Sequence, residues 1–280
     1  AIEKFSIWLY RPCVHLAFTK MNGAGNDFVL IDNREGGVSL TRDQIAKLCH
    51  RQRGIGADGL ILFRHGREGT DWAWDFYNAD GSDAEMCGNG ARCFARYISK
   101  VAGANGSLQF ETVCGVIDAS IGSDAVTINL TEPHDLALNE AITTSAGEQT
   151  VHSLNTGVPH AALFVGDADA AMVENLGSEI RHHEHFAPAG TNVNFVQILE
   201  PGHIRVRTYE RGVGETLACG TGVSAAALLT ARLEGWESPV KVDVLGGDAL
   251  AVAFECSGDD FTSVQLTGPA EFVFEGTVEI

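Results

Sequence analysis

The sequence predicts an α+β protein built from two similar lobes. Short strand-like runs separated by turn residues fill both halves of the chain, and 32 of its 280 residues are glycine. Each half also holds a helix-like run entered through Cys-Gly-x-Gly, at Cys87 in "MCGNGARCFARY" and at Cys219 in "ACGTGVSAAALL". A chain of this length can form two domains of ordinary size, each with its own core.

The first half is predicted to contain two helices. The predicted helix over residues 42–52 follows Thr41, which has the spacing of a capping box with Gln44, and its apolar residues recur on one face. Residues 90–101 show the same helical spacing after the first Cys-Gly-x-Gly motif. The strands predicted around these helices are 15–21, 27–33, 59–64, 73–78, 107–113, 115–121 and 125–130.

The second half repeats this plan. Helices are predicted over 169–180 and from Cys219 to a stop near Gly235, because glycine is a common helix terminator. Residues 240–255 read as a hairpin that turns at Gly246-Gly247. The other predicted strands are 151–157, 160–166, 192–198 and 203–212, and the closing segment 263–280 is also strand-like.

Composition limits the classes of function. The formal net charge is −18 and lysine and arginine do not cluster, which disfavours nucleic acid and anionic membranes as partners. No apolar run reaches the length of a membrane span. The short apolar patch at 5–10 lacks the features of a secretory signal, and residues 1–13 read as an extension before the fold.

Seven cysteines occur at irregular spacings without a C-x-x-C motif, so no zinc ribbon or other metal site is predicted. Free thiols in a reducing compartment, the cytoplasm, are the simplest interpretation. Inert structural roles are expected for four of them, and Cys13 allows no interpretation. These four are Cys49, Cys93, Cys114 and Cys256.

The remaining two cysteines, Cys87 and Cys219, are candidate catalytic residues. Each precedes a predicted helix, whose unpaired N–H groups and partial positive charge favour a thiolate and can bind a carboxylate. Two facing thiols suit inversion of a carbon that bears a hydrogen, because one removes the proton and the other returns it from the opposite side. The N–H groups would stabilise the carbanion beside a carboxylate.

Other interpretations of the motifs are weaker. Buried inert cysteines are common, but that interpretation needs two coincidences in the same local pattern. The segment "GTGVSA" at 220–225 fits a dinucleotide-binding pattern, yet no acidic residue follows on a second strand at the expected distance.

Five blocks of the chain resemble the diaminopimelate epimerase family, in the family's order. They are "MNGAGNDFVLIDNR", "GIGADGLI", "NADGSDAEMCGNGARCFARY", "YERGVGETLACGTG" and "TGPAEFVFEG", spread over residues 18–276. The resemblance implies an isomerase that interconverts LL- and meso-diaminopimelate without pyridoxal phosphate, metal or other cofactor, in lysine and peptidoglycan precursor synthesis. Relatives in this family also make a homodimer a reasonable expectation.

The resemblance further implies two lobes, each a strongly curved, mostly antiparallel sheet wrapped round a central helix, with the active site between them. The last strand would return to the first lobe. Residues 1–131 and 268–280 would then form one lobe and residues 132–267 the other, with a boundary near Glu132-Pro133.

Carried over by motif, the two thiols would be the acid and base, and the helix starts would hold the carboxylate at the reacting carbon. Arg211 would bind the distal carboxylate and Glu210 an ammonium group. The predicted substrate-binding residues are Asn26, Asn78, Gly88, Asn89, His160, Asn194, Glu210, Arg211, Gly220 and Thr221. Taken singly, the asparagines could be turn residues, Glu210 and Arg211 a surface pair, and His160 a structural histidine.

Two positions depart from the family pattern. Val158 stands where an asparagine is expected, and its side chain cannot hydrogen-bond the substrate, so Asn155 or Asn192 would have to compensate. Gly59 stands where some members have glutamine. Both departures bear on substrate recognition and leave the thiols untouched.

Two rival functions stay open. Proline racemases and hydroxyproline epimerases resemble this fold and use two thiols, but Asn78, Glu210 and Arg211 would have no role with proline. In the second rival, a non-catalytic binding or redox-sensing protein, Cys87 and Cys219 would form a disulfide. Because such oxidation would inactivate an epimerase, activity is expected to need reductant.

Overall fold

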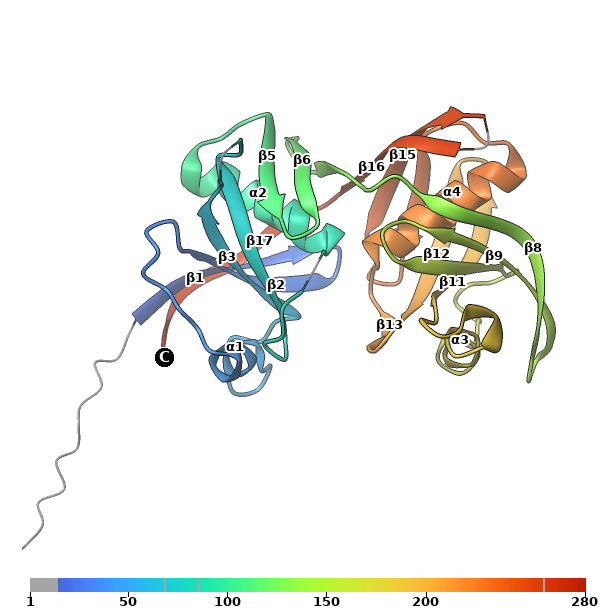
Figure 1. Ribbon diagram of the computed structural model, residues 1–280, viewed down its shortest axis with the longest axis horizontal. Coiled ribbons are helices and arrows are strands. Elements are labelled where there is room, and N and C mark those ends of the chain that lie inside the picture. Colours follow the sequence, from blue (N-terminus) through green and yellow to red (C-terminus); the bar gives the residue numbers. More distant parts are fainter. Residues whose placement is uncertain (1–14, 68, 85, 259) are drawn as a thin grey trace, which may run out of the picture.

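The structure, a computed structural model, describes residues 15–67, 69–84, 86–258 and 260–280. The expected extension at 1–13, with Cys13, lies outside this part of the chain. Figure 1 shows two lobes side by side, and each holds a long helix against a curved sheet. The predicted α+β class with two pseudo-symmetric lobes is confirmed.

Four α-helices and one 3-10 turn occur in the described residues. They are α1 (Arg42–Cys49), α2 (Gly88–Ala102), α3 (Val173–Arg181), η1 (Glu184–Phe186) and α4 (Gly220–Glu234). The strands of the first half are β1 (His15–Gly23), β2 (Asn26–Asp32), β3 (Gly59–His65), β4 (Trp72–Asn78), β5 (Ser107–Thr112), β6 (Gly115–Ile121) and β7 (Val126–Asn129). Those of the second half are β8 (His134–Thr144), β9 (Gly147–Asn155), β10 (Pro159–Phe164), β11 (Asn192–Glu200), β12 (His203–Glu210), β13 (Gly214–Thr216), β14 (Val240–Val244), β15 (Ala249–Ser257), β16 (Asp260–Gly268) and β17 (Glu271–Glu279).

Both lobes follow one connection plan. In the first lobe, α1 links the parallel pair β2 and β3, and α2 links the parallel pair β4 and β5. In the second lobe, α3 links the parallel pair β10 and β11, and α4 links the parallel pair β12 and β14. Parallel neighbours need a crossover, which these helices provide, and the other ladders are antiparallel. The repeat is therefore one of topology as well as of motif.

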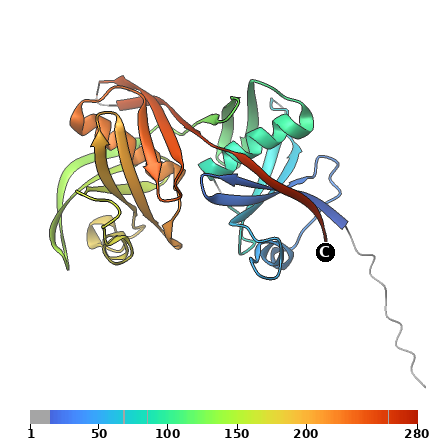
Figure 2. The same ribbon diagram turned by 180° about the vertical axis from the view of Figure 1, so that it is seen from behind.

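The sheets of the two lobes are joined through one ladder, in which β16 pairs with β7. The chain then crosses back, and β17 pairs along the length of β1 (Figure 2). The boundary proposed near Pro133 falls between β7 and β8 and stays a prediction, because hydrogen bonds of the sheet continue across the lobes.

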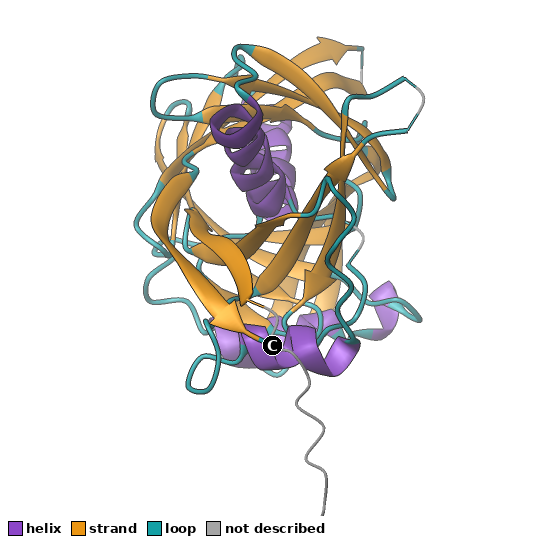
Figure 3. Cartoon of the chain, turned by 90° about the vertical axis from the view of Figure 1, so that its left-hand side faces the viewer, coloured by secondary structure: helices purple, strands orange, loops and turns teal. Residues whose placement is uncertain are grey.

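The central helices are buried on nearly every side. Figure 3 shows a helix enclosed by a ring of strands. Most residues of α2, and nearly all of α4 before Arg232, are buried. The apolar residues of both helices form part of the main hydrophobic core. Both helices end at left-handed glycines, Gly103 and Gly235, and the predicted stop at Gly235 is confirmed.

Two helices are shorter than predicted. The capping box at Thr41 is present, but α1 ends at Cys49, because the turn that follows donates Ile55 N–H and Gly56 N–H to the Leu48 carbonyl. Helix α3 begins at Val173, four residues later than predicted. The Asp167 side chain accepts from the next backbone N–H groups, and such local bonds compete with helix formation.

The sequence analysis missed strands β8 and β13. Strand β8 is largely exposed and irregular, with register shifts against β9 and positive φ at Asp135 and Asn139. It therefore lacks a clean alternation of apolar and polar residues. Strand β13 has three residues, too few to show any period. The hairpin of β14 and β15, with its turn at Gly247, agrees with the prediction.

Candidate active site

The two Cys-Gly-x-Gly motifs lie against each other. Cys87 and Cys219 are the N-cap residues of α2 and α4, and both have extended backbones. A Cβ atom placed on Gly220 would lie 3.6 Å from Gly88 Cα, so the two helix starts are in direct contact. A Cβ atom added at Gly88 or Gly220 would touch the other helix, and at Gly220 it would also crowd Leu266 at 3.1 Å. Two positive helix ends thus meet at one point between the lobes.

A side chain bridges the two motifs. Asn89 Nδ2 donates to the carbonyl of Ala218, the residue before Cys219, over 3.1 Å. Asn89 itself is 1% exposed. Its side-chain amide therefore fastens the start of α2 to the segment that leads into α4, and leaves its backbone N–H at the helix start.

A cleft of about 1080 Å³ opens beside this contact. Segments of both lobes line it, and five of the residues predicted from the sequence are among them: Asn26, Asn78, Cys87, Glu210 and Arg211. The other charged residues of its lining are Arg51, Asp58, Asp80, Asp83 and Glu215. Charges of both signs suit a ligand that carries ammonium groups as well as carboxylates.

Burial dominates the acidity of Cys87. Loss of hydration raises the pKa of its thiol to about 11, although the N–H groups of Asn89 and Gly90 and the charge of Arg92 act in the opposite direction. The expectation that the helix start lowers the pKa of Cys87 below its usual range is therefore wrong. The helix does lower the pKa, but its contribution is smaller than that of burial.

Cys219 has the same balance with a different neighbour. Burial and the nearby Glu210 carboxylate raise the pKa of its thiol, while hydrogen bonds with Thr221 and Gly222 lower it. Burial also raises the pKa of Glu210, whose carboxylate accepts from Thr216 Oγ1 over 2.6 Å and interacts with the Cys219 thiol. Burial therefore raises the pKa of both thiols.

These shifts predict how Cys87 reacts with iodoacetamide. A raised pKa favours the neutral thiol, so the thiolate fraction is small at neutral pH and grows about tenfold per pH unit up to about pH 10. The rate of Cys87 alkylation, followed by peptide mass spectrometry, is expected to rise over that whole range. The same cysteine in urea-unfolded protein is the control. A plateau below pH 8 would show instead that the helix start outweighs burial.

A charged network behind Cys87 escaped the sequence analysis. Cys87 Sγ donates to Asn26 Oδ1 over 3.4 Å, and Asn26 Nδ2 donates to Asp58 over 2.6 Å. Arg51 bridges Asp58 and Asp27. Although burial opposes it, Arg51 and Lys20 hold the pKa of Asp27 at about 2. The network fixes the Asn26 amide so that its oxygen faces the thiol. Asp58 lies in the block "GIGADGLI", one of the five that resemble the family, and that resemblance could have pointed to this residue.

Glu210 and Arg211 sit at the end of the β12–β13 hairpin. Asn192 Oδ1 accepts from Arg211 N over 2.8 Å, and the Arg211 guanidinium contacts the Ala189 carbonyl over 3.4 Å. Among the described residues this is the one hydrogen bond of the Arg211 guanidinium, so most of its donors are left for a ligand in the cleft that it lines. In this structure the Asn192 side chain therefore holds the backbone of Arg211.

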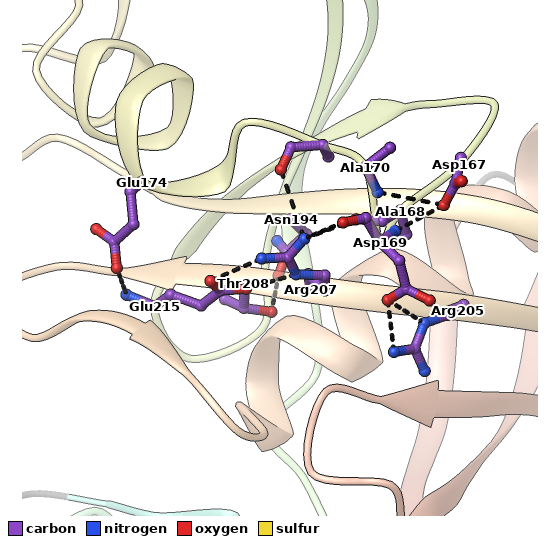
Figure 4. A network of polar contacts seen from close by, with 11 residues as sticks. Asp167, Ala168, Asp169, Ala170, Glu174, Asn194, Arg205, Arg207, Thr208 and Glu215 are labelled. Carbon is purple, nitrogen blue, oxygen red and sulfur yellow. Dashed lines mark hydrogen bonds and ion pairs between the residues drawn. The ribbon is translucent and has the colours of Figure 1, made fainter.

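An ion pair clamps the base of this hairpin (Figure 4). Arg207 on β12 donates twice to Glu215 on β13, over 2.6 and 2.8 Å. The same guanidinium donates to the carbonyls of Ala168 and Asp169. The Glu215 N–H donates to Glu174 of α3. The clamp thus holds the hairpin to the loop before α3.

His160 and Asn194 lie behind Thr221 and are fully buried. Thr221 Oγ1 joins His160 Nε2 over 3.0 Å and Cys219 Sγ over 3.5 Å. Asn194 bonds His160 and accepts from Thr208. Burial lowers the pKa of His160 to about 3, so this ring is neutral. A direct substrate contact by either residue stays a prediction, since the structure places both one layer behind the cleft.

Comparison with known proteins gives the same family that the sequence blocks resemble. The family model of diaminopimelate epimerase matches residues 18–134 and 152–273. Diaminopimelate epimerase of Hydrogenobaculum sp. (strain Y04AAS1) is 44% identical, over 93% of this chain and 98% of that protein. The enzyme of Aquifex aeolicus is 43% identical, over 93% and 97%.

The chain belongs to the diaminopimelate epimerase family. Solved structures at low identity share its fold. A phenazine biosynthesis protein of the PhzF family from Bacillus anthracis matches with a TM-score of 0.73 at 15% identity, over 95% of this chain and all of that one. A hydroxyproline epimerase from Agrobacterium vitis matches with a TM-score of 0.70 at 18% identity, over 95% and 93%.

The two departures from the family pattern have different settings. A Cβ at Gly59 would lie 2.8 Å from both Phe76 and the Tyr77 carbonyl, so this chain has no room there for a side chain. Val158 is half-buried in the turn before β10. Asn155, considered as its substitute, accepts from the N–H of Gly157 in the same turn.

Asn78 also belongs to a turn. Its side chain donates to Ser82 and to the Asp83 carbonyl, and it lines the cleft at the same time. Among the cysteines read as inert, Cys49 and Cys93 are buried, whereas Cys114 and Cys256 are exposed, so burial does not account for the latter two. No helix in the described ranges is both long and apolar enough to cross a membrane.

Proposed function

We propose that the protein interconverts LL- and meso-diaminopimelate, with Cys87 and Cys219 as the two acid–base groups. The observation that carries this proposal is the direct contact of two cysteine-capped helix starts beside a charged cleft, in a member of this family. The same proposal places the enzyme in the cytoplasm, where both thiols stay reduced. A homodimer stays a prediction.

The reaction would proceed by transfer of one proton on each face. One cysteine, as thiolate, takes the α-proton, and the electron pair of the C–H bond passes into the adjacent carboxylate group. The opposite thiol then gives its proton to the same carbon, which inverts it, and the two cysteines exchange protonation states. N–H groups at Gly88, Asn89, Gly220 and Thr221 would hold the carboxylate as charge develops.

The second amino-acid end of the substrate would lie toward Arg211 and the acidic lining. Arg211 has a mostly unused guanidinium, suited to a carboxylate, and Asp58, Asp83 and Glu210 offer oxygens to ammonium groups. Proline has no second end, so these groups favour diaminopimelate over the proline racemase alternative.

Arg211→Met tests this placement. We expect the KM for diaminopimelate to rise about tenfold to hundredfold, because a charge-assisted bond to a carboxylate is lost. The kcat is expected to change less, since this contact is distant from the reacting carbon. Arg205→Met is the matched control, because Arg205 lies on β12, the strand that leads to Arg211, and is not part of the cleft lining. Equal KM values in both variants would contradict the assignment.

The function itself is tested by incubating the reduced protein with LL-diaminopimelate in D2O. Incorporation of deuterium at the α-carbon together with formation of the meso isomer is the expected result. Proline and hydroxyproline are run as rival substrates. Inversion of either of these without turnover of diaminopimelate would move the chain to the other function, and no exchange with any substrate would refute both.

A further inference from the structure

Behind the two helix starts lies a buried charge that the mechanism has not used. Arg92 is on α2, and 0% of its surface is exposed. Side chains on a helix lean toward its N-terminus, so Arg92 reaches the residues three and four positions before it. Its Nη2 donates to Asn89 Oδ1 over 2.9 Å and its Nη1 to the Gly88 carbonyl over 3.4 Å.

The third contact ties Arg92 to the segment that crosses between the lobes. Arg92 Nε donates to the Pro269 carbonyl over 3.2 Å. Its guanidinium packs on Gly268, where an added Cβ would lie 3.1 Å from Arg92 Cζ. All three acceptors are neutral. Within the ranges that the structure describes, Arg92 takes part in no ion pair, unlike the arginines of the Arg51 and Arg207 pairs.

A buried charge without a partner is costly, and proteins usually pair it. Here the cost is increased by two helix N-termini, whose partial positive charges meet at Gly88 and Gly220. The region is therefore positive, and its acidic neighbours do not neutralise it directly. Asp248 acts on Arg92, and Glu210 acts on the two thiols, but neither forms an ion pair with Arg92. One bound carboxylate at the helix starts would supply the missing charge.

The two lobes differ at this position. Arg92 follows Cys87 by five residues, and the residue five positions after Cys219 is Ser224. Ser224 Oγ donates to the Gly220 carbonyl over 2.9 Å, the bond that Arg92 makes with Gly88 on the other helix. The matching backbone bond is thus made by a neutral side chain in α4, so the bond does not require a charge.

We propose that Arg92 is a positioning residue whose buried charge makes the contact of the two helix starts a site for a substrate carboxylate. This inference rests on the proposed function. Arg92 does not touch the substrate; it acts through the electrostatic potential at the cleft and through Asn89, which it orients. Its influence on Cys87, whose pKa it lowers, agrees with this direction.

The potential can be measured without turnover. Cys87 is alkylated separately with iodoacetate, an anion, and with iodoacetamide, its neutral counterpart, and the ratio of the two rates is taken. Both reagents need the same thiolate, so a change in thiol pKa cancels in the ratio. We expect the ratio to fall at least about threefold in Arg92→Gln and Arg92→Met, and to change little in Arg92→Lys.

Comparison of these variants separates charge from packing. Lysine keeps the charge but loses the planar fork, while glutamine keeps a donor and loses the charge. Ser224→Ala, the equivalent position of α4, should leave the ratio unchanged. With diaminopimelate, Arg92→Gln is expected to raise KM and to lower kcat, because the carboxylate is bound in the ground state and gains charge in the transition state.

The outcomes decide the proposal. An equal ratio in wild type and Arg92→Gln would overturn it, as would parallel losses in Arg92→Lys and Arg92→Gln. Failure of both neutral variants to fold while Arg92→Lys folds would also overturn it, since the charge would then be structural. If Arg92→Gln loses the anion preference but the wild-type protein does not turn over diaminopimelate, the role of Arg92 is supported and the proposed reaction is refuted. The two failures are therefore distinguishable.

Discussion

Replacing Cys87 or Cys219 by alanine is expected to lower the rate of inversion by at least about a thousandfold. Positioned acid–base groups contribute roughly 10²–10⁴-fold each, and inversion requires one on each face of the carbon. The remaining thiol can still remove a proton and return it to its own face. Exchange with retained configuration is therefore expected to persist longer than inversion in each variant.

The measurement follows deuterium incorporation and the ratio of LL to meso isomers in the same samples. Cys93→Ala is the matched control, because Cys93 lies on α2 but packs in the core near Gly23, outside the lining of the cleft. It should lose some stability and keep its turnover. An inversion rate within tenfold of wild type in either catalytic variant would rule out the two-thiol mechanism.

Arg207→Met is expected to reduce the free energy of unfolding by about 3 kcal/mol. Arg207 and Glu215 have side chains that are each 14% exposed, and the variant leaves the largely buried Glu215 carboxylate with no cationic partner. The carbonyls of Ala168 and Asp169 lose their donor too. Since the hairpin carries Glu210 and Arg211, the KM for diaminopimelate should rise in parallel.

Two further variants test whether the loss of stability comes from the unpaired Glu215 carboxylate. Arg207→Met combined with Glu215→Leu removes both charges and should recover much of the lost stability. Arg205→Met breaks the pair with Asp169, whose side chain is 61% exposed, and should cost about 1 kcal/mol or less. Urea unfolding of the variants gives the comparison. Equal losses of unfolding free energy in Arg205→Met and Arg207→Met would show that the buried Arg207–Glu215 pair stabilises the protein no more than the exposed Arg205–Asp169 pair.

Features set by near neighbours could be predicted from the sequence. The capping box at Thr41, the glycine stop at Gly235 and the hairpin turn at Gly247 each depend on a few adjacent residues. The two Cys-Gly-x-Gly motifs indicated two helix starts, and both helices begin immediately after their cysteines. Strand β8 was missed because its exposed, irregular residues carry no period.

The sequence by itself thus determined the fold class, the repeated plan, the family and the residues from which the candidate site is drawn. The tertiary structure alone decided the acidity of Cys87, since desolvation sums over every element packed around the thiol and exceeds the local effect of its helix. It also decided that Asp58 orients Asn26 and that Arg92 is buried beside neutral acceptors. The Asn26–Asp58 and Arg92–Pro269 bonds join residues far apart in the chain, and hydrogen-bonding partners at such separations leave no pattern in a single sequence.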